Sequence, residues 1–320
     1  MSHGVMPALV IHGGAGVIRK DMGPEREQAV RAALHDALER GYAALKAGRP
    51  ALDAVTAAIA VLEDSPHFNA GRGAVFTHDG RNELDAAIMD GATLRAGSVA
   101  GVERVRNPIL LARAVMEHSP HVMLVGAGAQ AFARTQDIAL AEPSWFRTEE
   151  RWQQLQETLR HDAMGEHAAA DHVRHFGTVG ALALDMAGRL AAGTSTGGMT
   201  GKRWGRVGDA PVIGAGTWAD ARCAVSGTGW GEFYIRTAAA ARIAARVELC
   251  GESVAMAADA VINGEIPALG GSGGAIALGA DGSIAMPFNT DGMFRGWVGV
   301  DGVPHVAIWS ADEEAARRAI

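Results

Sequence analysis

The stretch GTVGALALDMAGRLAAGTSTGG, residues 177–198, decides the fold class of this chain. It predicts two strands of small apolar residues joined by a tight turn over Asp185–Gly188. The stretch GGAIALGADGSIAMPFNT, residues 273–290, repeats the design with a turn over Ala280–Gly282. Because hairpins of this kind build antiparallel sheets, we expect the second half of the chain to be largely antiparallel.

The segments around these hairpins alternate between helical and extended patterns. Asn107 is the expected N-cap of a helix that begins at Pro108, because proline suits the first helical position. Other helices are predicted over residues 24–47, 51–64, 231–249 and 252–262 and from about 128, and strands over 8–11, 74–77, 84–90, 96–101 and 121–125. This order predicts an α+β fold with helices on both outer faces of two stacked, mainly antiparallel sheets.

Residues 140–175 differ from the rest of the chain. The segment is polar, charged and rich in histidine, and its apolar periodicity is weak. A segment of this length inside a compact domain is usually a functional loop or a linker. It ends just before the Gly177–Thr178 dipeptide, which is a first indication of proteolytic processing.

Composition and charge exclude several classes of protein. The formal net charge of −7 gives no basic excess, which argues against nucleic acid as a partner. The N-terminus lacks the basic and apolar regions of a signal peptide, and no apolar run is long enough to cross a membrane. The two cysteines, Cys223 and Cys250, show no metal-ligand spacing. We therefore expect a cytoplasmic protein.

Three other motifs invite a functional interpretation. Gly126–Ala131 is similar to a dinucleotide fingerprint, but no βαβ unit with the required acidic residue follows it. Gly193–Gly197 and Gly270–Gly274 both match the G-x-S-x-G motif of serine hydrolases, with His305 as the one downstream histidine, yet neither is followed by a helix. His12 has no ligand-spaced neighbours, so a hydrogen-bonded structural histidine is favoured over a ligand or base.

The remaining pattern is a set of Gly, Thr and Ser clusters at the ends of predicted strands. A threonine at the start of a chain carries its own base, because its α-amino group has a pKa of about 7.7–8.0. Glycine before the threonine allows the open backbone conformation that an N-to-O acyl shift requires. Gly177–Thr178 therefore indicates a self-cleaving N-terminal nucleophile, although each cluster taken singly is typical of an ordinary turn.

At this point the sequence resembles the isoaspartyl peptidase / plant-type L-asparaginase family of N-terminal-nucleophile (Ntn) hydrolases. The matching motifs are HGGAG (12–16), FNAGRGAVFT (68–77), ELDAAIMDG (83–91), RVRNPILLARAVM (104–116), GTVGALALD (177–185), TSTGG (194–198), GRVGDAPVIGAG (205–216), SGTGWGE (226–232) and MPFNTDGMFRG (286–296). The resemblance implies a four-layer αββα sandwich in one domain, residues 1–320, made as a precursor. Cleavage between Gly177 and Thr178 would give an alpha subunit, 1–177, with 140–175 as a mobile linker, and a beta subunit, 178–320.

The resemblance also implies an activity, an assembly and a cation. The activity is hydrolysis of β-aspartyl (isoaspartyl) dipeptides and L-asparagine to L-aspartate, with no catalytic cofactor, by a dimer of αβ heterodimers. Backbone carbonyls would hold a structural Na⁺; they belong to Leu62, Glu63, Ser65, Phe68, Ala70 and Arg72.

The family's site residues carry over onto matching positions of this sequence. Thr178 is the implied nucleophile, with Thr196 orienting it and Asn69 lining the site. The implied oxyanion hole is formed by Thr228 and Gly229. The substrate-binding positions are Arg206, Val207, Gly208, Asp209, Thr228, Gly229, Trp230 and Gly231, with Arg206 on the substrate α-carboxylate and Asp209 on its α-ammonium group.

Two features bear on the substrate. The glycosylasparaginase branch has Asp before the nucleophile, whereas this chain has Gly177, which favours isoaspartyl dipeptides. Trp230 is bulkier than expected there and would narrow the entrance. The alternatives that the sequence leaves open are a glycosylasparaginase-type amidase, a G-x-S-x-G serine hydrolase, and a non-catalytic binding protein with Thr178 in a buried strand.

Overall fold

Two central strands show why the large sheet is buried on both faces. The computed structural model describes residues 6–16, 18, 22–165 and 177–310. In β1 (Ala8–Gly16), Leu9 and Ile11 face one apolar core, and Val10 between them faces another. β5 (Val179–Leu184) alternates in the same way. Because side chains alternate along a strand, a strand covered on both faces reads as a continuous apolar run.

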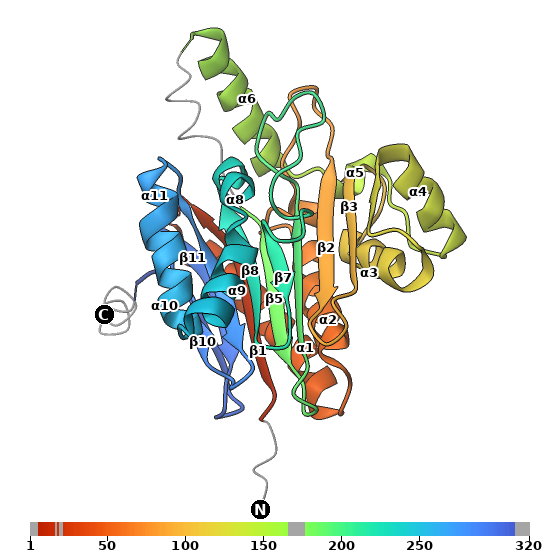
Figure 1. Cartoon of the computed structure of the whole chain (residues 1–320). Helices are drawn as coiled ribbons and strands as arrows, with labels where there is room; N and C mark the ends of the chain where they lie inside the picture. The colour runs from red at the N-terminus through yellow and green to blue at the C-terminus, as the bar shows by residue number, and fades with distance from the viewer. Residues whose placement is uncertain (1–5, 17, 19–21, 166–176, 311–320) are drawn as a thin grey trace, which may run out of the picture.

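The described strands form one eight-stranded and one four-stranded sheet (Figure 1). The order in the large sheet is β12 (Pro304–Ala307), β11 (Gly292–Val298), β1, β5, β6 (Leu190–Thr196), β2 (Leu84–Asp90), β3 (Ala96–Val102) and β4 (Met123–Val125). The order in the small sheet is β10 (Ile284–Ala285), β9 (Gly273–Gly279), β8 (Cys223–Gly229) and β7 (Thr217–Ala219). Neighbouring strands in these two sheets are antiparallel, apart from the parallel pair β3–β4.

Helices cover the outer face of each sheet, and an apolar core lies between the sheets (Figure 1). The large sheet carries α1 (Pro24–Lys46), α2 (Ala51–Asp64), α3 (Pro108–His118) and α4 (Gly126–Thr135). The small sheet carries α8 (Gly231–Thr237), α9 (Ala239–Cys250), α10 (Val254–Asp259), a π-helical turn (Ala260–Glu265) and α11 (Ile266–Ala268). The predicted α+β fold, a four-layer αββα sandwich, is confirmed.

The predicted strand over residues 74–77 is wrong. The structure has a 3₁₀ turn at Gly71–Gly73 instead, and only Thr77 forms an isolated bridge. Two side chains take the place of a neighbouring strand: Asn69 accepts a hydrogen bond from the Val75 N–H, and Asn82 donates to the carbonyls of residues 74 and 75. The backbone is thus satisfied without joining a sheet.

Two predicted helices need smaller corrections. The helix predicted over 231–249 is interrupted at Ala238, whose φ of 49° separates α8 from α9. Asn107 occupies the N-cap position of α3, but its side chain donates to Ala60 and Asp64 instead of capping the helix. In the first turn of α3, the Ile109 N–H donates instead to the carboxylate of Glu63.

Much of the expected linker is helical. α5 (Pro143–Phe146) and α6 (Glu149–Ala163) lie inside residues 140–175, whereas residues 166–176 fall outside the described part of the chain. The buried face of α6 consists of Arg151, Gln154, Leu155 and Thr158. These positions have helical spacing but only one is apolar, so a search for apolar periodicity misses the helix.

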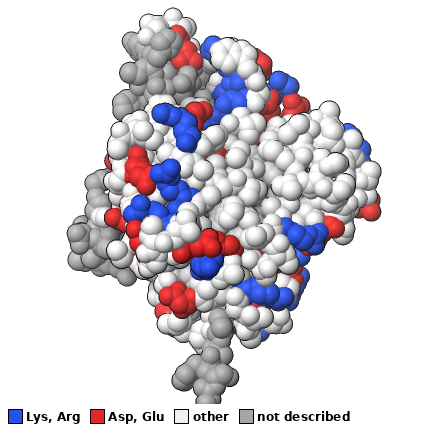
Figure 2. Space-filling model, viewed as in Figure 1, with Lys and Arg blue, Asp and Glu red and all other residues white. Residues whose placement is uncertain are grey.

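Among the described residues, no helix combines the length and the apolar character needed to cross a membrane. Figure 2 shows the Lys and Arg side chains interspersed with Asp and Glu side chains on the face it presents.

Candidate active site

The predicted nucleophile lies opposite its predicted partner in the central hairpin. Thr178 directly precedes β5 and Thr196 ends β6, and the two strands pair with Val179 opposite Ser195. The next step of this register brings Thr178 beside Thr196, with 3.2 Å between their hydroxyl oxygens. Thr178 is 5% exposed, and the Thr196 hydroxyl accepts a hydrogen bond from the Gly198 N–H. Thr196 is therefore held in a fixed orientation beside Thr178.

The carbonyl group of Gly177 is held by several hydrogen-bond donors. Its oxygen lies 2.9 Å from Nδ2 of Asn69, 3.0 Å from the Thr196 hydroxyl and 2.8 Å from the Thr178 hydroxyl. Asn69 is itself fixed, because Nδ2 also donates to the Gly198 carbonyl and Oδ1 accepts from the Val75 N–H. Donors aimed at a carbonyl oxygen stabilise the negative charge that develops there when a nucleophile attacks the carbon.

Arg206 forms a two-point ion pair with Glu232. Nε lies 2.9 Å from Oε1 and Nη2 lies 2.8 Å from Oε2. Partial burial raises the pKa of Glu232, but the hydrogen bonds and charge of Arg206 outweigh it, so that the pKa is lowered overall. The Arg206 side chain is thereby presented in the flat, forked geometry that suits a carboxylate. Glu232 is the last residue of the SGTGWGE motif, but the sequence alone indicates no role for it.

Asp209 is buried beside this arginine. Burial raises its pKa to about 7, against the opposing effect of the Arg206 charge. Within the described part of the chain, its Oδ2 is buried and takes part in no hydrogen bond. A Cβ on Gly231 would lie 2.7 Å from Asp209 Oδ1, so the glycine keeps the space beside the carboxylate open. A buried carboxylate with an unpaired oxygen is a suitable partner for an ammonium group.

The predicted oxyanion-hole residues lie at the end of β8. Thr228 is fully buried, and its hydroxyl oxygen accepts from the Ala15 N–H at 3.2 Å. Gly229 has a φ of 148°, a conformation that side chains disfavour, and a Cβ there would clash with the Ser272 carbonyl. Glycine is therefore required at residue 229 to carry the chain past β9.

One small cavity joins most of the predicted positions. Its volume is about 10 Å³, and its lining residues are Gly177, Thr178, Thr196, Gly198, Met199, Arg206, Gly208, Asp209 and Gly229. Val207, Trp230, Gly231, Thr228 and Asn69 are not part of this lining. The Trp230 ring packs edge-on against Phe233 at 5.1 Å. Thr178 therefore lines the same cavity as Arg206 and Asp209, the residues predicted to bind the substrate α-carboxylate and α-ammonium groups. Trp230 packs beside this cavity.

Behind Thr178, a chain of hydroxyl groups crosses between the sheets. His12 Nε2 lies 2.9 Å from the Ser226 hydroxyl, which lies 2.7 Å from that of Thr194. Thr217 continues the chain by donating to Thr194. Burial lowers the pKa of His12 to about 3, against a raising effect of the Thr178 backbone, so the imidazole stays neutral. His12 is thus buried and hydrogen-bonded, as the sequence predicts.

The geometry rules out the serine-hydrolase alternative. Ser195 is buried within β6, and its hydroxyl donates to Glu63 at 2.6 Å. His305 is on β12, four strand positions from β6 and so about 19 Å away at a strand spacing of about 4.8 Å, and it pairs with Asp301. Ser272 lies in the loop before β9, where its carbonyl accepts from the Trp230 N–H. Ser195 therefore cannot reach His305, and Ser272 is followed by strand β9 instead of the helix that a nucleophile elbow requires.

The predicted cation loop is wound tightly around its glycines. A Cβ on Gly71 would clash with the Glu63 carbonyl, and one on Gly73 would clash with the carbonyls of Pro66 and Phe68. Carbonyl oxygens are hard donors of the kind that alkali and alkaline-earth cations prefer. Backbone carbonyls of this loop are thus donors of the type that Na⁺ accepts, and the structural Na⁺ implied by the resemblance stays a prediction.

Comparison with known proteins places this geometry in context. An asparaginase family model matches residues 5–308. The chain is 51% identical over 309 residues to the isoaspartyl peptidase of Salmonella typhimurium, covering 94% of this chain and 98% of that protein. It is 43% identical over 297 residues to the plant-type L-asparaginase of Pyrobaculum calidifontis, covering 91% and 97%. It is 38% identical over 323 residues to the probable isoaspartyl peptidase/L-asparaginase 2 of Arabidopsis thaliana, covering 94% and 98%.

Proposed function

The chain belongs to the asparaginase family, and from that premise we propose that it is an N-terminal threonine hydrolase. Its substrates are β-aspartyl dipeptides and L-asparagine, from which it releases L-aspartate. Relatives named isoaspartyl peptidase and plant-type L-asparaginase support this activity. The resemblance drawn from the sequence motifs is confirmed as family membership.

The proposed maturation step begins with the hydrogen bonds to the Gly177 carbonyl oxygen. The Thr178 hydroxyl oxygen attacks the Gly177 carbonyl carbon, the bond to the Thr178 nitrogen breaks, and that nitrogen takes up the hydroxyl proton. Asn69 and Thr196 stabilise the developing oxyanion from their present positions, 2.9 and 3.0 Å away. Water then hydrolyses the ester, which gives chains 1–177 and 178–320 from the single domain.

The proposed hydrolysis uses the amino group that this step frees. The α-amine of Thr178 takes the hydroxyl proton while the hydroxyl oxygen attacks the side-chain carbonyl of the substrate. Thr228 and Gly229 receive the oxyanion, and the amine returns its proton to the leaving nitrogen. Arg206 binds the substrate α-carboxylate and Asp209 its α-ammonium group. Water then hydrolyses the acyl-enzyme and frees L-aspartate.

The single observation that carries this proposal is the triple contact on the Gly177 carbonyl beside a buried Thr178. The test is mass analysis of the expressed protein, followed by an assay with β-aspartyl-leucine. We expect two fragments, the smaller beginning at Thr178, and one uncleaved, inactive band for Thr178→Ala. A wild-type protein that stays one 33.2 kDa chain would refute the proposal and favour a binding protein. Release of sugar from a glycosylated asparagine without dipeptide hydrolysis would instead favour the glycosylasparaginase alternative.

Three further features belong to the same proposal. A Na⁺ ion bound by backbone carbonyls in the Leu62–Arg72 loop would brace the segment that carries Asn69. The matured enzyme would assemble as a dimer of αβ heterodimers, and it would act in the cytoplasm. Size-exclusion chromatography with light scattering tests the assembly: about twice the mass of one chain is expected, and the mass of one chain would contradict it.

A further inference from the structure

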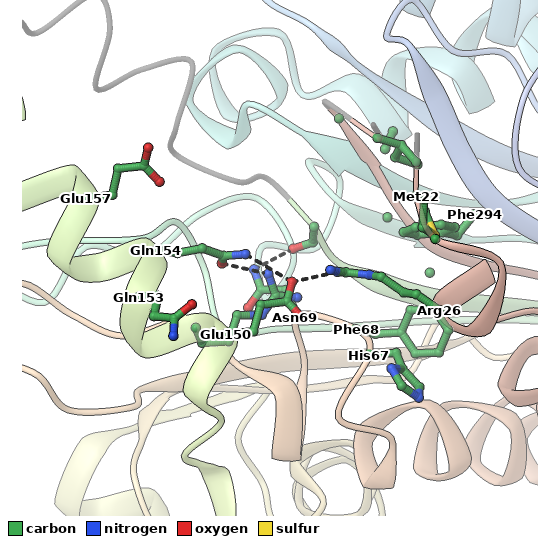
Figure 3. Close-up of a pocket in the computed structure, with 18 residues that line it drawn as sticks. Met22, Arg26, His67, Phe68, Asn69, Glu150, Gln153, Gln154, Glu157 and Phe294 are labelled. Carbon is green, nitrogen blue, oxygen red and sulfur yellow. Dashed lines mark hydrogen bonds and ion pairs between the residues drawn. The ribbon is translucent and has the colours of Figure 1, made fainter. Parts of the chain in front are cut away.

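A second, larger cavity lies on the other side of Gly177. Its volume is about 400 Å³, against about 10 Å³ for the cavity that contains Thr178, and Gly177 lines both. Figure 3 shows it between α6, which carries Glu150 and Glu157, and the start of α1, which carries Arg26. The glycine-rich end of β1 forms its floor. Among the described residues, Gly177, at the predicted cleavage point, is common to the linings of both cavities.

Cleavage would change how Gly177, which lines both cavities, is held in place. In the uncleaved chain, Gly177 is fixed by its peptide bond to Thr178 and by the hydrogen bond from Asn69. After cleavage, Gly177 ends the larger fragment and is no longer tied to the nucleophile. The small cavity is lined by the groups that suit an aspartyl headgroup, and Gly177 borders it on the side of the large cavity. Once Gly177 is released, the leaving part of a dipeptide has the large cavity beyond it to enter.

The lining of the large cavity offers two kinds of contact. Ile18, Met22 and Phe294 contribute apolar surface. Arg26 contributes a guanidinium group whose one polar contact within the described residues joins Nη2 to Glu150 Oε1 at 2.6 Å. The side chains of this pair are 46% and 41% exposed, so the pair is weak and can exchange for another carboxylate. The remaining N–H donors of Arg26 are available for a two-point contact.

We propose that this cavity binds the leaving residue of a β-aspartyl dipeptide, with Arg26 as the ligand of that residue's free α-carboxylate. The inference rests on the proposed function and goes beyond it by naming the preferred leaving group, an amino acid with an apolar side chain. Glu150 competes with the substrate for Arg26 and sets the affinity. The ordered helix α6 remains part of the site after cleavage, because it lies in the 1–177 fragment.

Three substrates separate this role from the headgroup site. L-Asparagine has no leaving residue, β-aspartyl-leucinamide has one without a carboxylate, and β-aspartyl-leucine has both. For Arg26→Gln, we expect KM for β-aspartyl-leucine to rise roughly five- to tenfold, with kcat, and KM for the other two substrates, within about twofold of wild type. Glu150→Gln is expected to lower KM for β-aspartyl-leucine. Arg40→Gln, an exposed arginine on the same helix, is the matched control and should change nothing.

The outcomes separate the two proposals. An unchanged KM for β-aspartyl-leucine in Arg26→Gln would overturn the inference, as would an equal rise for all three substrates. A higher KM for β-aspartyl-leucine than for β-aspartyl-glycine would overturn the apolar preference. If the wild type hydrolyses none of these substrates, the proposed function itself fails. Arg26→Lys, which keeps the charge, should recover part of the lost affinity, and fragment sizes equal to wild type verify that each variant matures.

Discussion

The guanidinium group of Arg206 and the carboxylate of Glu232 face each other in a two-point ion pair, with separations of 2.9 and 2.8 Å. The arginine that we assign to the substrate α-carboxylate is therefore already matched to a carboxylate of the protein. This pairing holds the fork in its flat geometry before substrate arrives. A substrate must displace Glu232 or share the guanidinium with it.

Arg206→Lys should weaken substrate binding. An ammonium group cannot make two parallel hydrogen bonds to a carboxylate, so we expect a loss of about 2 kcal/mol in binding free energy. This loss corresponds to a decrease of roughly thirtyfold in kcat/KM, mainly through a higher KM. Steady-state kinetics with L-asparagine measures the change. Arg203→Lys in the same loop, whose arginine pairs with Asp162 at 3.5 Å, should behave like wild type. Equal effects of the two substitutions would argue against the assignment.

Asn69→Ala should slow self-cleavage. Asn69 donates to the Gly177 carbonyl, and loss of one oxyanion donor typically lowers a rate about 10²- to 10³-fold. A gel time course of the purified precursor measures the rate. Asn82→Ala is the matched control, because Asn82 is also buried and donates to the carbonyls of residues 74 and 75 in the same segment. Within the described part of the chain, its side chain forms no hydrogen bond with Gly177. Similar slowing in both variants would show that loop support, rather than oxyanion stabilisation, is responsible.

Asp209 should produce an acidic limb in the pH profile. Its pKa is raised to about 7 by burial, so in the free enzyme it loses its charge as the pH falls below that value. Because only the carboxylate attracts the substrate ammonium group, kcat/KM should decrease from pH 8 to pH 6. Asp209→Asn should lower kcat/KM at every pH and remove the contribution of residue 209 to this decrease. The titration of the Thr178 α-amine then remains as the cause of the acidic limb. An unchanged acidic limb in Asp209→Asn would contradict the assignment.

Glu63 should make the folded chain less stable at high pH. Burial is the main cause that raises its pKa to about 8 from 4.5, so the folded state binds an extra proton between these values. The free energy of unfolding should therefore fall as the pH rises from about 5 to 8, with a slope of up to about 1.4 kcal/mol per pH unit from this residue. Asp209 has the same sign over pH 4 to 7.

Glu63→Gln isolates that contribution. The amide keeps an acceptor for Ser195 and the Ile109 N–H but cannot ionise. Urea unfolding of Thr178→Ala, which remains one chain, with and without Glu63→Gln, gives the two slopes. We expect the slope between pH 7 and 8 to be shallower in the double variant. Identical slopes there would show that Glu63 does not titrate in this range.

Removal of Na⁺ should destabilise the loop that carries Asn69. A ligand at 100 times its dissociation constant stabilises a fold by about 2.7 kcal/mol, so Tm should be higher in NaCl than in choline chloride of equal ionic strength. Thermal melts over a series of NaCl concentrations measure the effect. A Tm that depends only on ionic strength would argue against a specific cation.

The elements that sequence analysis predicted correctly are those specified by local pattern. The hairpin over 177–198 follows from alternating small apolar residues around an Asp-to-Gly turn, and the Asp185 carboxylate does accept the turn N–H groups. The register of that hairpin alone brings Thr178 to Thr196. The pairing of the predicted nucleophile with its predicted partner therefore follows from one local hairpin.

The errors occur where the partners of a segment are distant side chains. Residues 74–77 look extended, but Asn69 and Asn82 satisfy their backbone. α6 looks like a linker because Arg151 and Thr158 fill its buried face; Arg151 donates to the Gly73 carbonyl. Thr148, whose side chain accepts from the Arg151 N–H, is a local N-cap signal of that helix.

The sequence by itself determined the layered fold, because strand periodicity and turn residues are local properties of the chain, and its motifs predicted the cleavage point and the site residues through the family resemblance. Only the tertiary structure decided how the charges are matched. The pairs Arg206–Glu232 and Arg26–Glu150 arise where separate elements pack together. So does the burial of the Asp209 Oδ2 atom, which has no hydrogen-bond partner among the described residues. Burial and distance set the strength of a charge, and neither is a property of the linear sequence.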